Sequence, residues 1–134
     1  MKDPIIRPAY GSEISDACAM MEYYPSVESR GITNGFATAV YDHWAPNSVN
    51  VHICGEPLKY RNFVYAMFEY PFLEQKKGLL LAITPEDNKL SLDFSRILGF
   101  KEVHRIEDGW KPGVALIMKE MRKEHCRWLM RSAA

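Results

Sequence analysis

The sequence predicts an α/β (α+β) fold built on a mixed sheet, and three observations carry this prediction. Val49, Val51 and Ile53 alternate with polar residues, which is the period of a strand with one apolar face. The unbroken apolar run 79–83 has the length and composition of a strand buried on both faces. Apolar residues at helical spacing precede and follow that run, so strands and helices alternate along the chain.

The first half predicts, in order, a strand, a helix and two more strands. Ile5 and Ile6 lie between prolines and predict a short edge strand. A helix follows, with Ser12 as its N-cap or Ser15–Asp16 as a competing start, and Pro25 ends it. Residues 25–34 are rich in turn formers and give no clear element. Strands are then predicted over 36–41 and 49–54, separated by a turn over 42–48.

The second half predicts two helices and three strands. The helix from Arg61 to about Glu74 should kink or end at Pro71. After the strand 79–83, a second helix is expected to start at Thr84–Pro85, with proline in the favoured first position, and to stop at Gly99. The remaining segments are strands over 100–105 and 114–118, a turn over 107–113, and a basic tail over 119–131.

Composition bounds the function classes. The 134 residues are 47% hydrophobic and 25% charged, which is typical of one globular domain, predicted over 1–134. The formal net charge of zero disfavours nucleic acid or an anionic membrane as the partner. The three cysteines form no CxxC pair and the four histidines show no ligand spacing, so we expect no metal. No apolar run is long enough to cross a bilayer, and a cytoplasmic location is expected.

Residues 81–100 carry a resemblance to a known family. The segment Leu81-Ala82-Ile83-Thr84-Pro85-Glu86-Asp87-Asn88, continued by Lys89-Leu90-Ser91-Leu92-Asp93-Phe94-Ser95-Arg96-Ile97-Leu98-Gly99-Phe100, resembles the GNAT (N-acetyltransferase) pattern of a strand followed by Asn-x-x-Ala-x-x-x-Tyr-x-x-x-Gly-Phe. Asn88, Ser91, Gly99 and Phe100 match this pattern. Residues 5–9 look like the opening strand of the family. The resemblance covers most of 5–129 and implies a splayed mixed sheet with helices on both faces.

A narrower resemblance is to compact GNAT proteins encoded in phage and prophage genomes. It is carried by Asp42-x-Trp44-x-x-Asn47-Ser48-x-x-x-His52 and by the ending Glu124-x-Cys126-Arg127-Trp128-Leu129.

The sequence departs from the family pattern at two places. Residues 58–62 lack the glycines of the usual pyrophosphate loop, and Ser95 stands where many members have a tyrosine that acts as the acid.

The resemblance implies acetyl-CoA as the acyl donor, and two segments are candidates to bind it. A helix N-terminus can hold a pyrophosphate through its free N–H groups. The candidate is the backbone of Tyr60, Arg61, Asn62 and Phe63, with charge from Lys59 and Arg61; the alternative is a solvated helix start. Pantetheine can pair with a strand edge, here that of Ile53, Cys54 and Gly55. The alternative there is an ordinary strand end.

Four polar side chains are candidates near the acyl group. His52 is the candidate base, because histidine titrates near neutrality; the alternative is a buried histidine that holds the loop of Asp42 and Asn47. Asn88 either contacts the cofactor or caps its helix. Ser91 and Ser95 are one helical turn apart and share a face. Ser95 could hydrogen-bond the thioester or the departing sulfur, or be a polar spot beside the core.

Other chemistry-bearing residues have simpler interpretations. Trp44, Trp110 and Trp128 could line an acceptor pocket, but tryptophan is more often core. Cys126 has no base at a readable spacing and is predicted to be structural. The basic residues of the tail are predicted to form a solvated face; they are Lys119, Arg122, Lys123, Arg127 and Arg131.

The resemblance thus implies an N-acetyltransferase that acts by direct attack of a primary amine on acetyl-CoA. The acceptor amine is not identified, and a homodimer is compatible with the sequence. The alternative is a non-catalytic structural or host-interaction protein on the same fold, of phage origin, since a fold does not fix a function.

Overall fold

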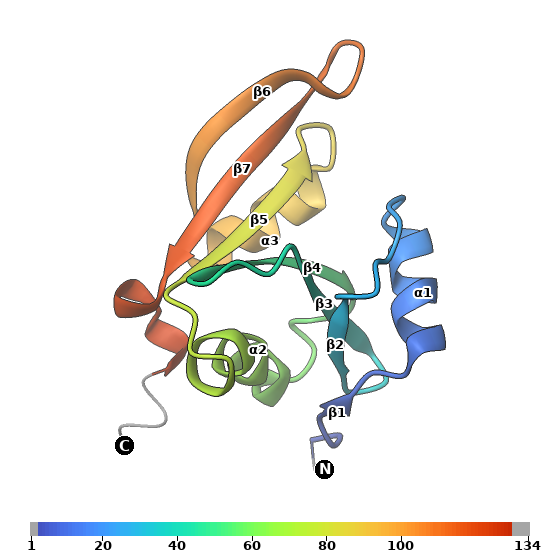
Figure 1. Ribbon diagram of the computed structural model, residues 1–134, viewed down its shortest axis with the longest axis vertical. Coiled ribbons are helices and arrows are strands. Elements are labelled where there is room, and N and C mark those ends of the chain that lie inside the picture. Colours follow the sequence, from blue (N-terminus) through green and yellow to red (C-terminus); the bar gives the residue numbers. More distant parts are fainter. Residues whose placement is uncertain (1–2, 130–134) are drawn as a thin grey trace.

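The computed structural model describes residues 3–129 and is a seven-stranded sheet with three α-helices (Figure 1). A five-residue π-helix, Tyr70–Glu74, continues α2, and a short 3-10 helix, Lys123–His125, follows the last strand. The elements are, in chain order, β1 Arg7–Pro8, α1 Gly11–Met20, β2 Arg30–Thr33, β3 Ala37–Asp42, β4 Ser48–Gly55, α2 Arg61–Glu69, β5 Leu79–Pro85, α3 Lys89–Leu98, β6 Lys101–Lys111 and β7 Val114–Arg122.

The sheet has the strand order β1-β2-β3-β4-β5-β7-β6, and all neighbours are antiparallel except β4 and β5. This parallel pair is short. Its register runs only from Ser48↔Leu79 to Asn50↔Leu81, although both strands continue beyond it. In Figure 1, β5 then runs beside β7 while β4 stays with β3. The sheet is therefore splayed between β4 and β5, as the family resemblance implied.

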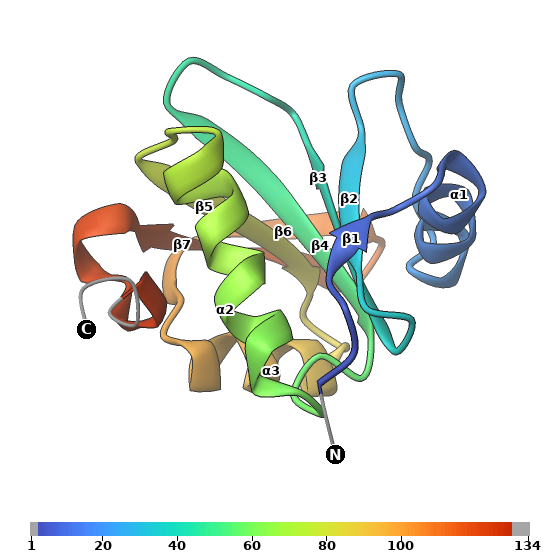
Figure 2. The same ribbon diagram turned by 90° about the horizontal axis from the view of Figure 1, so that it is seen from below.

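The two faces of the sheet carry different helices. On one face, Val49 and Val51 of β4 pack with Phe63, Met67 and other residues of α2 in the main core cluster, which also contains Leu98 of α3. On the other face, Val40 of β3 forms a smaller cluster with Ala17 and Cys18 of α1, and Cys54 packs against it. Figure 2 shows α2 along one side of the sheet, with α1 away from it. Alternation along β4 thus directs odd-numbered side chains toward α2 and even-numbered ones toward α1.

In the first half, the structure corrects three predicted boundaries. The first strand is Arg7–Pro8 rather than 5–6, because Pro8 pairs with Ile32 at the sheet edge. Neither Ser12 nor Ser15 caps α1: its N-cap is Tyr10, whose backbone N–H donates to Glu13 Oε1 at 2.8 Å. The helix also ends at Met20, well before Pro25. Strand β2 lies within the segment that gave no clear element.

In the second half, the end of α2 and the stop of α3 are as predicted. Pro71 lies in the π-helix that follows α2, where a missing N–H is tolerated, and Gly99 ends α3 with a φ of +106°. Pro85 does not start a helix; it ends β5 opposite Leu116, and α3 begins at Lys89. The run 79–83 is only half-buried apart from Leu80, so the expectation of burial on both faces is wrong for most of it.

The last two strands are longer than predicted. Strand β6 runs through the expected turn 107–113 to Lys111, with an irregularity between Ile106 and Lys111, and β7 runs to Arg122. These strands form the hairpin that projects at the top of Figure 1. Within residues 3–129, no helix is long and apolar enough to span a membrane. Arg131 lies outside the described residues.

Candidate active site

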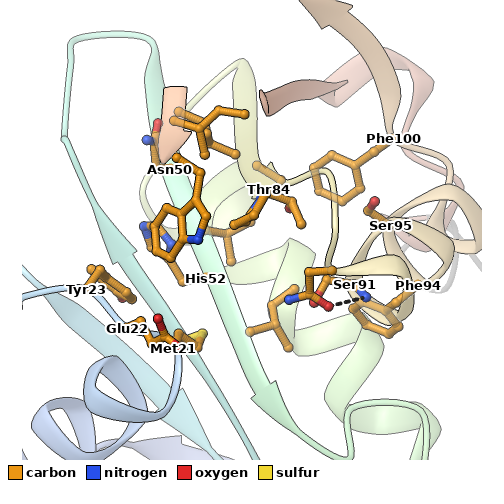
Figure 3. A pocket seen from close by; sticks show the side chains of 18 of the residues that line it. Met21, Glu22, Tyr23, Asn50, His52, Thr84, Ser91, Phe94, Ser95 and Phe100 are labelled. Carbon is orange, nitrogen blue, oxygen red and sulfur yellow. Dashed lines mark hydrogen bonds between the residues drawn. The ribbon is translucent and has the colours of Figure 1, made fainter. Parts of the chain in front are cut away.

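A cleft of about 790 Å³ occupies the place where β4 and β5 separate. Its walls are β4 from Asn50 to Ile53, β5 from Ala82 to Pro85, and α3 from Asn88 to Leu98. The end of α1 and the following turn, Met20–Tyr23, close the opposite side. Figure 3 shows Glu22 and Tyr23 beside His52, with Ser91 and Ser95 across the cleft. The cleft therefore reaches both faces of the sheet.

On the α1 side of this cleft, the half-buried His52 pairs with the buried Asp42. Its Nε2 lies 3.0 Å from Oδ1 of Asp42, which is only 3% exposed, and its ring stacks on Tyr23 with centroids 4.2 Å apart. Antiparallel pairing produces this pair, since Asp42 ends β3 and lies opposite Asn50, two residues from His52. His52 lines the cleft and contacts Asp42 but is only half-buried, so its role as a base stays a prediction. No contact joins it to Asn47 among the hydrogen bonds of the described residues.

The electrostatics of this pair fix which groups carry protons. Burial raises the pKa of Asp42, but hydrogen bonds from His52 and His43 outweigh it and leave that pKa below its usual value. Asp42 is thus an ionised acceptor, so Nε2 of His52 carries the proton and Nδ1 keeps its lone pair when the ring is neutral. Burial and the neighbouring Cys18 raise the pKa of Tyr23, which stays protonated. Tyr23 was not predicted, and its place in a turn gives no periodic signal.

The α3 side of the cleft carries the residues of the family pattern. Asn88 is the N-cap of α3, because its Oδ1 accepts from the backbone N–H of Ser91 at 3.2 Å, and it also lines the cleft. Ser91 and Ser95 both line the cleft, as their helical spacing predicted. Ser95 is buried and donates to the carbonyl oxygen of Leu92 at 3.0 Å.

Lys119 is the main correction to the predicted site. It was assigned to a solvated basic face, but it is 8% exposed and donates to Ser95 Oγ at 2.9 Å. The extended length of β7 explains this, because Ala115, Ile117, Lys119 and Met121 alternate on its buried face. That alternation was present in the sequence. The prediction missed it by ending the strand at Met118.

The predicted pyrophosphate segment lies at the start of α2 and does not line this cleft. The Phe63 side chain is in the core and its N–H donates to the Tyr60 carbonyl, so Phe63 does not offer a free donor. The Asn62 side chain donates to the Pro4 carbonyl, which ties the first residues to α2. Lys59 Nζ lies 4.3 Å from the centroid of the Phe36 ring and 3.7 Å from Glu56 Oε2. Arg61 is exposed.

The predicted pantetheine edge lies beyond the last β4–β5 pair. Ile53 lines the cleft, whereas the Cys54 side chain packs toward α1. Gly55 has a φ of +88°, and a Cβ there would lie 2.3 Å from the Phe36 carbonyl oxygen. Glycine is therefore required by the close approach of β3.

The other candidates have structural surroundings. Trp110 lines the cleft, but Trp44 and Trp128 pack against the core and donate to backbone carbonyls. Cys126 is buried, and burial raises its pKa to about 11, which agrees with a structural role. No cluster of three or more potential metal ligands occurs among residues 3–129.

The comparisons with known proteins come from structure. No family model and no curated protein matches the sequence. The spermidine/spermine N-acetyltransferase SpeG from Vibrio cholerae is similar with a TM-score of 0.70 at 12% identity, covering 96% of each chain. YncA from Salmonella typhimurium, a putative acetyltransferase with its cofactor acetyl-CoA, has a TM-score of 0.65 at 12% identity, over 90% of this chain and 94% of that one.

A shorter match is the ribosomal-protein-S5-alanine acetyltransferase from Vibrio fischeri, with a TM-score of 0.59 at 13% identity over 75% of this chain. The present chain spans 64% of that protein's length. The mixed seven-stranded sheet and its helices have the GNAT acetyltransferase fold. The narrower resemblance to phage-encoded members is not addressed by these structures and stays a prediction.

Proposed function

We propose that this protein is an N-acetyltransferase that moves an acetyl group from acetyl-CoA to a primary amine by direct attack. The observation that carries the proposal is the cleft at the separation of β4 and β5, which places the His52–Asp42 pair on one side and Ser91 and Ser95 on the other. Acyl transfer needs a base at the amine and polar donors at the thioester, and the two sides supply these groups separately. The similarity to YncA, whose cofactor is acetyl-CoA, supports the same donor here.

In this proposal the donor binds along β4 and at the start of α2. The backbone of Ile53, Cys54 and Gly55 continues past the last pair with β5, so it can accept an amide-rich pantetheine chain as a short added strand. The backbone N–H groups of Arg61 and Asn62, at the start of α2, have no carbonyl one turn earlier in the helix to donate to, and Lys59 and Arg61 add positive charge. Asn88 and Ser91 contact the donor from α3.

The amine loses a proton before it attacks. A neutral His52, with its Nε2–H held by Asp42, accepts that proton at Nδ1, and the resulting imidazolium is stabilised by the Asp42 carboxylate. The free nitrogen lone pair then attacks the thioester carbon. Backbone N–H groups of β4 beyond Asn50 polarise the carbonyl oxygen, and this kind of contribution is usually the largest in acyl transfer.

The first test is donor binding. Calorimetry with CoA and acetyl-CoA is expected to give binding at millimolar ligand or below. A complete absence of binding at that concentration rejects the acetyltransferase proposal and favours the non-catalytic alternative. The measurement needs no knowledge of the acceptor.

The second test is turnover. Thiol release with a panel of primary amines is expected to identify an acceptor, and His52→Gln is expected to lower kcat by about a hundredfold or more, the usual contribution of a general base. The matched control is His104→Gln, which changes an exposed histidine of β6 outside the cleft. Equal losses in both variants, or no loss in His52→Gln, would contradict the role of His52.

A further inference from the structure

Lys119 is a buried lysine on the strand beneath α3. The residue is more than nine-tenths buried beneath α3, and its Nζ donates to two oxygens of that helix, Ser95 Oγ at 2.9 Å and the Leu92 carbonyl at 3.0 Å. A buried ammonium group is costly unless it is paired and hydrogen-bonded. No carboxylate lies within 4.0 Å of Nζ among the described residues, so both of its partners are neutral.

The charged groups around Lys119 come from two elements. Glu102 lies opposite Lys119 on β6, and Asp93 and Arg96 act on it from α3. Its neighbour on β5 is Ala82, which carries no charge. Burial lowers the pKa of the Lys119 amine, and Glu102 opposes that effect only in part. The group is therefore a better proton donor than an exposed lysine.

The single polar side chain between Lys119 and the cleft, among the hydrogen bonds of the described residues, is Ser95. Ser95 lines the cleft and Lys119 does not. A lone serine hydroxyl is too weak an acid to protonate a departing thiolate. An ammonium group that donates to the same oxygen makes the hydroxyl proton more acidic, because it stabilises the negative charge left on Oγ.

We propose that Lys119 acts through Ser95 to stabilise and protonate the thiolate of CoA as it leaves. The inference rests on the proposed function and deepens it. In this structure the Ser95 hydroxyl donates to the Leu92 carbonyl; in the proposed step it turns from Leu92 to the sulfur, while the Leu92 carbonyl keeps its bond from Lys119. Ser95 is thus the residue that contacts the sulfur, and Lys119 is a positioning residue that holds and polarises the Ser95 hydroxyl. The two together supply the acid that a tyrosine would supply from the position of Ser95.

The proton balance of the step is complete. As the carbon–nitrogen bond forms and the tetrahedral intermediate collapses, the carbon–sulfur bond breaks and the sulfur leaves with the bonding electron pair. The sulfur takes the Ser95 hydroxyl proton, and Ser95 Oγ takes a proton from the Lys119 ammonium group. The acceptor nitrogen releases its second proton to water, the neutral Lys119 amine regains a proton from water, and His52 releases the first proton to solvent. The products are an amide and CoA with a free thiol.

The test uses bound CoA and no acceptor, so it is separate from the test of turnover. The ultraviolet absorbance of the thiolate is followed against pH for CoA bound to the full chain and to Lys119→Met and Ser95→Ala. A nearby cation favours the thiolate, so its removal is expected to raise the pKa of the bound thiol by about one unit, a tenfold loss of thiolate at a given pH. Lys119→Arg keeps the cation and is expected to restore much of the effect. The matched control is Lys101→Met, which removes an exposed lysine from the neighbouring strand.

The outcomes separate the two proposals. If the unmutated chain binds no CoA, the proposed function fails and this inference fails with it. If CoA binds and the thiol pKa is the same in Lys119→Met as in the unmutated chain, Lys119 is only a structural partner of Leu92 and the inference is overturned. If Lys119→Met does not fold, Ser95→Ala decides, because it leaves the bond from Lys119 to Leu92 in place: an unchanged thiol pKa in that variant is equally fatal to the inference.

Discussion

Replacing Asp42 by asparagine removes the negative charge that His52 and His43 both contact, at 3.0 and 2.8 Å. The side chain of Asp42 is 5% exposed and that of His52 is 18% exposed, so this hydrogen bond is shielded from water, whereas His43 is 76% exposed and contributes little. A hydrogen bond to a charged group contributes about 1.5–3 kcal/mol, and asparagine keeps one acceptor oxygen. We therefore expect Asp42→Asn to lower the free energy of unfolding by about 1–2 kcal/mol at neutral pH.

The loss should depend on pH in a defined direction. The pKa of Asp42 is lower in the folded chain than in the unfolded chain, so its stabilising contribution is full above the ordinary carboxyl pKa and disappears as the pH falls through the folded value. The variant lacks this titration. Its deficit relative to the unmutated chain is therefore expected to shrink as the pH is lowered from about 5 toward the folded pKa.

Urea unfolding of both chains over that pH range measures the deficit directly. Asn47→Ala is not a suitable control, since Asn47 also binds the backbone; His43→Gln is, because it leaves the His52–Asp42 bond in place. A deficit that stays constant as the pH falls, or a variant as stable as the unmutated chain at neutral pH, would refute the assignment of Asp42 as an ionised partner of His52.

Three further predictions concern the backbone conformation of two glycines and the positive charges at the start of α2. Gly99→Ala is expected to cost on the order of 1 kcal/mol in unfolding free energy, because φ is +106° there, and urea unfolding checks it. Gly55→Ala should cost more than Gly99→Ala in the same assay, since its Cβ would lie 2.3 Å from a backbone oxygen of Phe36; an equal or smaller cost would show that the strands separate easily. Lys59→Ala with Arg61→Ala is expected to weaken CoA binding more at low salt than at high salt, and calorimetry showing the same loss at both would exclude a charge contribution.

Much of the fold could be predicted because its strongest signals are local. The alternation over 49–54, the helix stop at Gly99 and the break at Pro71 each depend on a few neighbouring residues. The failures involve pairing over longer distances. Pro85 has the sequence of a helix start, but its pairing with Leu116 keeps it in β5. Strand β2 is short and follows turn formers, so only its pairing with β3 defines it.

The candidate site could be predicted only in part, for a related reason. His52 and Ser95 follow from strand alternation and helical spacing, and both lie in the cleft. Their partners Asp42 and Lys119 come from other strands, and no local pattern joins them. The sequence Glu107-Asp108-Gly109 predicts a turn, but in the structure it is a bulge within β6, with Asp108 at a φ of +57°. The single domain over 1–134 and the individual donor contacts remain predictions.

The proposed chemistry depends on which face of the sheet each side chain of β4 occupies. His52 faces α1 and the cleft, while Val51 and its apolar neighbours face the core under α2. A slip of one residue between β3 and β4 would exchange these faces, so it would place an imidazole in the core and remove His52, the proposed base, from the cleft. Asn47 ties the start of β4 to the segment that leads into β5: its carbonyl accepts from the backbone N–H groups of Gly78 and Leu79, and its side chain also accepts from Gly78. The length of the loop before β4 helps to set the register between β3 and β4. Insertions and deletions in that loop are therefore expected to be far less tolerated than substitutions there, because they change the register.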